Sequence, residues 1–232
     1  INEKLKLRGN SLECVSNATN KYQMRKKLLN ANIPVPCFHL VNDNNLSSVK
    51  KGLFSLKESI IVKPTDRSGS RGVELVDRKN PEQLEAALER ALSTSFSREA
   101  IIENLIDGTE YSVESISYCG EHYIVAITQK VTTGPPSFIE KGHFIPANIP
   151  LSTKNKIENV TKKALHALCI TDGPSHTELI SDTSGNIHIV EVGPRMGGDF
   201  IGSTLVKLST GYDFLKGMID VSLATFEPPN IS

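Results

Sequence analysis

The chain has 232 residues, 38% of them hydrophobic, and its 26 lysines and arginines balance its 26 aspartates and glutamates. This size allows a sizeable core, in one large domain or two small ones, while a net charge of zero provides no global attraction to nucleic acid or to an anionic membrane. The four cysteines fit no zinc-binding spacing and no apolar run approaches the length of a membrane span, so we expect free thiols and a cytoplasmic protein.

In chain order, the first expected elements are a helix, two strands and a second helix. Apolar residues at helical spacing predict a helix over Lys21–Ala31, which the segment Ile33–Pro36 ends. Ser59–Lys63 is a β-branched run and predicts a strand, with a second short strand at Val73–Val76. Asn80-Pro81 is a favourable N-cap and first helical residue, and the apolar spacing beyond it predicts an amphipathic helix.

The second half predicts two hairpins separated by a helix. The strands of the first hairpin are expected at Tyr111–Tyr118 and His122–Val131, and an amphipathic helix follows over Ile157–Leu168. The second hairpin joins Thr177–Asp182 to Asn186–Val192. Hairpins with separate helices indicate an α+β fold and argue against a doubly wound parallel sheet.

The last hairpin predicts two facing carboxylates. If its turn is centred between residues 184 and 185, Glu178 lies opposite Glu191. The same register pairs Asp182 with Ile187 and Ile180 with Ile189, which places these isoleucines on the face of the two glutamates. Side chains directly opposite one another have Cβ atoms about 4.5 to 5.5 Å apart.

Two carboxylates at that separation repel each other, so the repulsion must be relieved. A shared proton, the nearby Arg195 or a divalent cation are the three alternatives, and Mg²⁺ is the usual ion between carboxylates and phosphate oxygens. A shift of one residue in register would instead place both glutamates on a solvated face.

A Gly/Ser-rich segment, Thr65–Gly72, follows the strand that ends at Lys63. Its glycines allow consecutive N–H groups to surround phosphate oxygens, and the hydroxyls of Ser68 and Ser70 add donors. The segment is not a Walker A motif, and a strand follows it where a dinucleotide-binding motif has a helix. A plain hairpin connection is the alternative.

Together these motifs resemble the ATP-grasp superfamily, in order, from Thr19 to Gly198. The resemblance implies two α+β subdomains with ATP between them, a metal site at Glu178 and Glu191, and Arg195 as the catalytic residue. It further implies the following nucleotide ligands: Lys21, Lys63, Ser68, Gly69, Ser70, Gly72, Glu103, the backbone of Asn104, Leu105 and Ile106, and Glu110. Within these, Glu103 and the three backbone groups would face adenine, and Glu110 the ribose.

One position departs from the family pattern, because Gly193 stands where the family commonly has an asparagine that binds metal or phosphate. This departure weakens the case for a second metal ion. The segment from Gly193 to Ile201 most resembles the subgroup of L-amino acid ligases and carbamoyl-phosphate-synthase-like proteins. The implied organisation is a tail of a preceding domain over residues 1–18, entry helices and a linker over 19–58, a lid over 59–105 and a catalytic subdomain over 106–232.

The function implied by the resemblance is a ligase that uses Mg-ATP, or Mn-ATP, to convert a carboxylate into an acyl phosphate for attack by an amine. Its expected partners are small-molecule carboxylates and amines, with no nucleic acid or membrane, and a homodimer is compatible with the family. A subunit that activates bicarbonate and a module that senses ATP without turnover are the alternatives.

Three further residues have two readings each. His143 could line the acceptor pocket, although a hydrogen-bonded loop residue is the simpler interpretation. His176 shares the face of Glu178 and could support it, or could be structural. Asp199 could bind an amine, or cap a helix.

Overall fold

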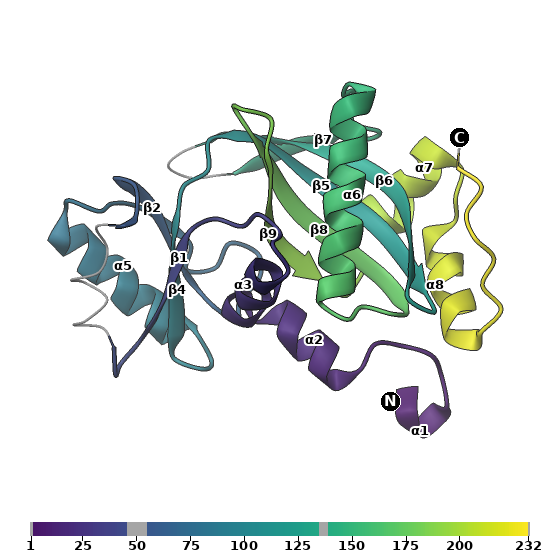
Figure 1. The fold of residues 1–232 in the computed structure, drawn as a ribbon, viewed down its shortest axis with the longest axis horizontal. Coiled ribbons are helices and arrows are strands. Elements are labelled where there is room, and N and C mark those ends of the chain that lie inside the picture. Colours follow the sequence, from purple (N-terminus) through teal and green to yellow (C-terminus); the bar gives the residue numbers. More distant parts are fainter. Residues whose placement is uncertain (1, 46–54, 135–138, 232) are drawn as a thin grey trace.

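The computed structural model describes residues 2–45, 55–134 and 139–231. Its helices and strands are α1 (Asn2–Leu5), α2 (Leu12–Thr19), α3 (Lys21–Asn30), β1 (Phe38–Asn42), β2 (Ser59–Pro64), β3 (Glu74–Asp77), α5 (Pro81–Thr94), β4 (Glu99–Asn104), β5 (Gly108–Tyr118), β6 (Glu121–Thr132), β7 (Glu140–Phe144), α6 (Leu151–Ala167), β8 (Gly173–Asp182), β9 (Ile187–Gly193), the π-helical turn η2 (Ile201–Leu205), α7 (Val206–Thr210) and α8 (Phe214–Leu223). Figure 1 shows two lobes, one built on β1 to β4 with α5 and the other on β5 to β9 with α6.

The smaller lobe is a four-stranded antiparallel sheet in the order β1-β4-β2-β3, called the small sheet below. The side chain of Asn80 accepts the N–H of Gln83 and starts α5 as expected. The buried face of α5 packs on this sheet, with Leu88 against a core that includes Ile60 and Ile102. The small sheet begins at β1, so it starts before the lid boundary expected at residue 59.

The larger lobe is a five-stranded antiparallel sheet in the order β7-β6-β5-β8-β9, called the large sheet below. Helices α2, α3 and α6 cover one face, and η2, α7 and α8 pack on the other (Figure 1). These antiparallel sheets with separate helices confirm the α+β fold. Within the described ranges, no helix is long and apolar enough to cross a membrane.

The N-terminal segment, expected to be the tail of a preceding domain, packs in part on the large sheet. Helix α2 buries Cys14 and Ala18 in the same core as α6 and the large sheet. It is therefore part of this lobe. The expected linker over 19–58 is also divided, because α3 packs with the large sheet and β1 belongs to the small sheet, while residues 46–54 lie outside the described residues.

The pairing of β8 with β9 agrees with the expected register at the glutamates and differs from it nearer the turn. Glu178 lies opposite Glu191, but Ile189 does not lie opposite Ile180. A bulge at Val190 explains the difference, because two residues of β9 there oppose one residue of β8. Ile189 therefore turns into the core, while Glu191 faces the other side of the sheet.

The turn itself fixes the shifted register. Gly185 has a φ of 77°, and the N–H of Asp182 donates to the carbonyl of Asn186. The Asp182 carboxylate accepts the N–H groups of Ser184 and Asn186. Asp182 thus pairs with Asn186, whereas the sequence predicted a pairing with Ile187. Ile187 is buried in the core and does not share the face of the glutamates.

Candidate active site

A pocket of about 550 Å³ lies between the small and large sheets and brings the expected site residues together. The expected residues that line it are Lys21, Lys63, Ser68, Gly69, Ser70, Glu103, Asn104, Leu105, Ile106, Glu110, Glu178, Glu191 and Arg195. Gly72 does not line the pocket. It has a φ of 71°, and an added Cβ would lie 3.3 Å from Pro64, so it shapes the base of the loop.

The two paired glutamates face the pocket, and each has a lysine beside it. Glu191 Oε2 lies 3.1 Å from Lys21 Nζ, and Glu178 Oε1 lies 3.5 Å from Lys130 Nζ. Burial alone would raise the pKa of Glu178, but hydrogen bonding to His176 and the charge of Lys130 hold this pKa below its usual range. About a third of each glutamate side chain remains exposed, at 34% and 29%. Accessible carboxylate oxygens on facing strands are donors that suit a Mg²⁺ ion.

Lys130 is a site residue that the sequence interpretation missed. Its ammonium lies between Glu178 and Glu140, 3.4 Å from an oxygen of the latter, and Glu110 is also near. Burial lowers the pKa of Lys130, yet these three carboxylates raise it above its usual value. The sequence does show a lysine at the end of the β6 run, but a bulge at Val125 in β6, opposite the step from Glu114 to Ser115 in β5, obscures the register that brings it to the pocket.

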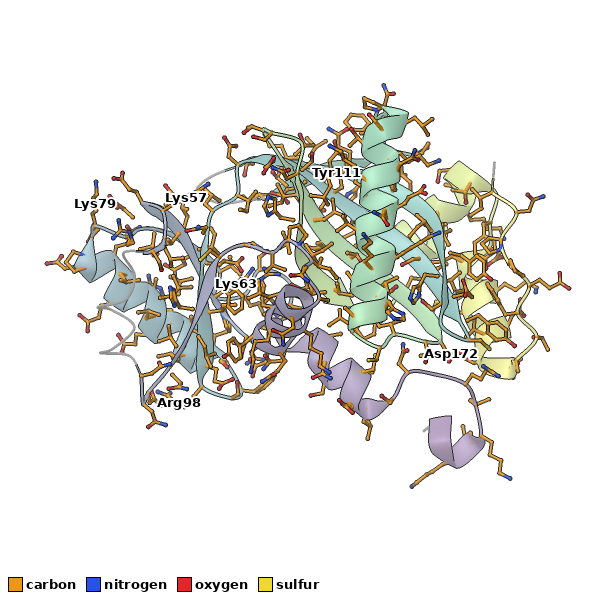
Figure 2. All side chains as sticks on the ribbon, viewed as in Figure 1. Lys57, Lys63, Lys79, Arg98, Tyr111 and Asp172 are labelled. Carbon is orange, nitrogen blue, oxygen red and sulfur yellow. The ribbon has the colours of Figure 1, made fainter. Side chains whose placement is uncertain are left out.

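Lys63 belongs to a buried ion triad with Glu103 and Arg25, which the sequence interpretation also missed. Figure 2 labels Lys63 where the small sheet approaches α3. One oxygen of Glu103 contacts the Lys63 ammonium, and the other lies 2.8 Å from Arg25 Nη2. Burial opposes ionisation of the glutamate, but the two cations lower its pKa to about 2. The Glu103 carboxylate therefore neutralises these two cations, and its expected contact with adenine stays a prediction.

Two backbone N–H groups that follow Glu103 already donate hydrogen bonds within the protein. The N–H of Asn104 donates to the carbonyl of Cys37, and the N–H of Leu105 donates to that of Ser59. These two N–H groups therefore donate within the protein, while the expectation that the backbone of residues 104–106 faces adenine stays a prediction. Burial raises the pKa of Glu110, in part opposed by Lys130.

The glycine- and serine-rich loop is fixed at its base and exposed at its tip. The guanidinium of Arg67 stacks on the Phe96 ring at 3.5 Å and donates to the carbonyl of Thr94 at 2.5 Å. Lys21 Nζ donates to the carbonyl of Arg67 at 2.5 Å, which joins the loop to α3. Ser68 to Arg71 are exposed at the pocket edge, where their donors can reach a phosphate.

Arg195 lies exposed at the pocket and partly fills the space above Gly193. Its Nη1 donates to the carbonyl of Met196 at 2.8 Å. An added Cβ on Gly193 would lie 3.4 Å from Arg195 Cγ and 3.6 Å from its Nε. The place where the family commonly has an asparagine is therefore next to the arginine side chain.

His176 is nearly buried at the pocket wall beside Glu178. Its Nε2 lies 3.4 Å from Glu178 Oε1, and its Nδ1 contacts Glu114. Burial would lower the pKa of His176, but hydrogen bonds to both glutamates raise it to about 9.

Two of the residues with two interpretations, His143 and Asp199, lie with Glu140 at one side of the pocket. Polar side-chain atoms of Glu140, His143 and Asp199 lie within 4.8 Å of one another, and the two carboxylates line the pocket. The cluster is acidic, and it adjoins the Lys130 ammonium through Glu140.

Comparison with known proteins places these features in a family. A family model described as an ATP-grasp domain matches residues 56–204. Alanine–anticapsin ligase of Bacillus amyloliquefaciens is 27% identical over 241 residues, which cover 94% of this chain and 50% of that protein. The L-arginine-specific L-amino acid ligase of Bacillus subtilis is 24% identical over 228 residues, which cover 97% and 54%.

A solved structure agrees with these relatives. The crystal structure of the L-amino acid ligase from Bacillus licheniformis matches with a TM-score of 0.82 and 29% identity, over 97% of this chain and 54% of that one. The chain spans about half the length of the curated relatives it matches. Because the family model covers well over half of the chain, and the pocket carries the expected carboxylates, lysines and loop, the chain belongs to the ATP-grasp family and is similar to its L-amino acid ligases.

Proposed function

We propose that this chain forms the nucleotide-binding and catalytic part of a ligase that uses Mg-ATP to join an amino acid, through its carboxylate, to an amine. The observation that carries the proposal is the pair Glu178 and Glu191, facing each other at a pocket that also holds Lys21, Lys63 and the glycine-rich loop. Alanine–anticapsin ligase and the L-arginine-specific L-amino acid ligase, to which the chain is similar, carry the names of amino acid ligases, and this similarity supports the substrate class.

Each group has a proposed task in phosphoryl transfer. Glu178 and Glu191 would hold the divalent cation, Mg²⁺ or Mn²⁺, which neutralises the terminal phosphates. Lys63 and the exposed N–H and hydroxyl groups of Ser68–Arg71 would hold phosphate oxygens. Lys21 links the loop to Glu191 and would keep both in place. The transfer needs alignment and charge neutralisation more than covalent help from the protein.

The two substrates can be placed by charge. Arg195 at the open side of the pocket would hold the carboxylate that receives the phosphoryl group, because its planar fork fits two oxygens. The acidic cluster of Glu140, His143 and Asp199 would attract an ammonium group. A free amine attacking the acyl phosphate forms the amide bond and releases phosphate, and closure of the two sheets on the substrates would exclude water.

The proposed lid is the small sheet with α5, extended from the expected residues 59–105 to include β1, and the catalytic subdomain is the large sheet with its helices. We also propose a reducing compartment, the cytoplasm, because all four cysteines are free thiols.

The first test is calorimetric titration of a non-hydrolysable ATP analogue into the intact protein, with and without Mg²⁺. We expect magnesium-dependent binding that is lost in the Glu178→Gln, Glu191→Gln double variant. A matched control is Glu58→Gln, which removes an exposed glutamate paired with Lys79 at the outer margin of the small sheet (Figure 2). Equal binding by the double variant and the control would disprove the metal assignment.

The second test measures ADP release by the intact protein with pairs of amino acids. Release that depends on both amino acids, with a dipeptide as product, is the expected result. Magnesium-dependent binding without turnover for any pair would leave a nucleotide site and contradict the ligase proposal.

A further inference from the structure

A buried pair, Glu114 and His176, lies beneath the pocket. The two residues face each other on β5 and β8, with 0% and 7% of their surface exposed. Oε1 of Glu114 contacts Nδ1 of His176. Burial of two ionisable side chains is unfavourable unless hydrogen bonds compensate, so the remaining contacts of the pair show what it holds.

The two remaining contacts lead to different parts of the site. Nε2 of His176 lies 3.4 Å from Oε1 of Glu178, and Oε2 of Glu114 accepts the backbone N–H of Gly197 at 3.0 Å. Gly197 is two residues beyond Arg195. The pair therefore connects the proposed metal-binding carboxylate to the loop that carries the arginine.

Gly197 is the residue type that this contact requires. An added Cβ at position 197 would lie 2.4 Å from Oε1 of Glu114 and 2.8 Å from Nδ1 of His176, distances too short for real contacts. At the next residue, Gly198, an added Cβ would meet nothing within 4 Å. Close approach, and not a left-handed backbone, accounts for glycine at position 197.

We propose that Glu114 and His176 are positioning residues that fix the Glu178 carboxylate and the Arg195 loop relative to each other. This inference rests on the proposed function and deepens it. A hydrogen bond from a histidine orients a carboxylate, and the same histidine is held by the glutamate that binds the Gly197 backbone. Outer partners of this kind typically change metal affinity or activity by about 10- to 100-fold when they are replaced.

The first experiment compares Gly197→Ala with Gly198→Ala in the intact protein. Binding of Mn²⁺ with a non-hydrolysable ATP analogue is followed by electron paramagnetic resonance, and kcat and KM are measured with the best amino acid pair. We expect Gly197→Ala to weaken Mn²⁺ binding by about tenfold or more and to lower kcat, with Gly198→Ala within about twofold of the parent protein. Equal effects of the two substitutions would overturn the inference.

Two substitutions of the histidine separate its contacts. His176→Asn retains an amide near the position of Nδ1, within reach of Glu114, and loses the contact to Glu178. His176→Gln places its amide near the position of Nε2 and retains the contact to Glu178. We expect His176→Gln to keep more Mn²⁺ affinity than His176→Asn, and the reverse order would contradict a role in orienting Glu178.

A final measurement does not depend on nucleotide binding. Hydrogen exchange of the Gly197 amide is followed in the nucleotide-free protein by NMR. The hydrogen bond to Glu114 predicts exchange at least about tenfold slower than at the exposed Gly198 amide, since a buried, bonded N–H must open before it exchanges. Fast exchange at Gly197 would overturn the positioning role of Glu114 and His176 even if the ligase proposal holds. Slow exchange in a protein that binds no nucleotide would mean that only the proposed function fails.

Discussion

At the scale of the single residue, Arg195 is attached to the fold by few contacts. It is exposed, and its bond to the Met196 carbonyl is a contact with its own neighbour in the chain. Such a side chain contributes little to folding stability, because surface substitutions usually change the free energy of unfolding by less than about 0.5 kcal/mol. Its position at the pocket therefore reflects its proposed chemistry.

Replacing Arg195 should separate activity from stability. For Arg195→Met we expect ADP release to fall by about 10²- to 10³-fold, since a donor to developing charge is lost. The free energy of unfolding in urea should stay within about 0.5 kcal/mol of the parent value. The control is Arg98→Met at the outer margin of the small sheet (Figure 2), where Arg98 pairs with Asp43 at 3.1 Å. Full activity in Arg195→Met would rule out the catalytic assignment.

Most residues that the sequence motifs identified do line the pocket. Several residues that pair with them and shift their pKa values could not be identified from the sequence. Lys63 lies at the end of a strand, and Glu178 and Glu191 lie opposite each other in a hairpin. Local sequence patterns reveal both kinds of position. Arg25 and Lys130 come from a helix and a strand distant in the chain, and a run of basic residues in a helix is usually a solvated face. The packing of α3 on the large sheet, with Arg25 reaching Glu103 of the small sheet, identifies Arg25 as buried.

At the scale of the element, the loop between β2 and β3 has two glycines with left-handed backbones and different surroundings. Gly69 has a φ of 67° and nothing within 4 Å of an added Cβ. Gly72 has a φ of 71°, and its added Cβ would lie 3.3 Å from Pro64 and 3.4 Å from Thr94. The tip of the loop is thus free of steric constraint and its base is not.

Alanine substitutions should distinguish these two positions. We expect Gly69→Ala to lower the free energy of unfolding by about 1 kcal/mol from backbone strain alone. Gly72→Ala should lower it by about 1 to 2 kcal/mol more, because its neighbours must also move. Urea unfolding measures both, and an equal loss in the two variants would mean that the base of the loop is not fixed as described.

The elements themselves were largely predictable. Helices α3, α5 and α6 and both hairpins were expected from spacing, caps and turn residues, because these signals are local. The strand β1 was missed, because its partner β4 lies some sixty residues later and the segment Phe38–Asn42 has no clear alternation. The bulge in β9 was missed for a different reason: strand periodicity assumes an uninterrupted ladder.

At the scale of the whole molecule, the buried Arg25 side chain joins the two lobes. Arg25 of α3 binds Glu103 of the small sheet, and its Nη1 donates to the carbonyl of Ile189 in the large sheet at 2.8 Å. It has no exposed surface. Movement of one sheet relative to the other must therefore strain or exchange these bonds.

This buried triad predicts a loss of stability in acid. The pKa of Glu103 is lowered from 4.5 to about 2 in the folded chain, so its contribution is fully present above about pH 4.5 and is lost as the pH falls toward 2. The loss should be on the order of 3 kcal/mol for a shift of this size. The free energy of unfolding in urea, measured between pH 6 and pH 2, tests this prediction, because the range includes the pKa of Glu103 in the unfolded and in the folded chain.

A variant that lacks all three charges of the triad provides the control for the acid-dependent loss of stability. In the triple variant Arg25→Met, Lys63→Met, Glu103→Leu, the acid-dependent loss should become smaller by about that amount. Arg25→Met alone should be less stable at neutral pH than the triple variant, because it leaves a buried carboxylate with one cation fewer. An unchanged pH profile in the triple variant would show that other carboxylates cause the acid sensitivity.

The bulge at Val190 has a consequence for changes in chain length. Deletion of one residue from a strand normally reverses the direction of every side chain beyond it. Within β9, removal of Val190 would instead leave Ile189 directed to the core and Glu191 directed to the pocket, because the deleted residue is the unpaired one. A related chain whose β9 is one residue shorter could therefore present the same pair of carboxylates. A position-by-position alignment without a gap would nevertheless assign the two carboxylates to opposite faces of the sheet.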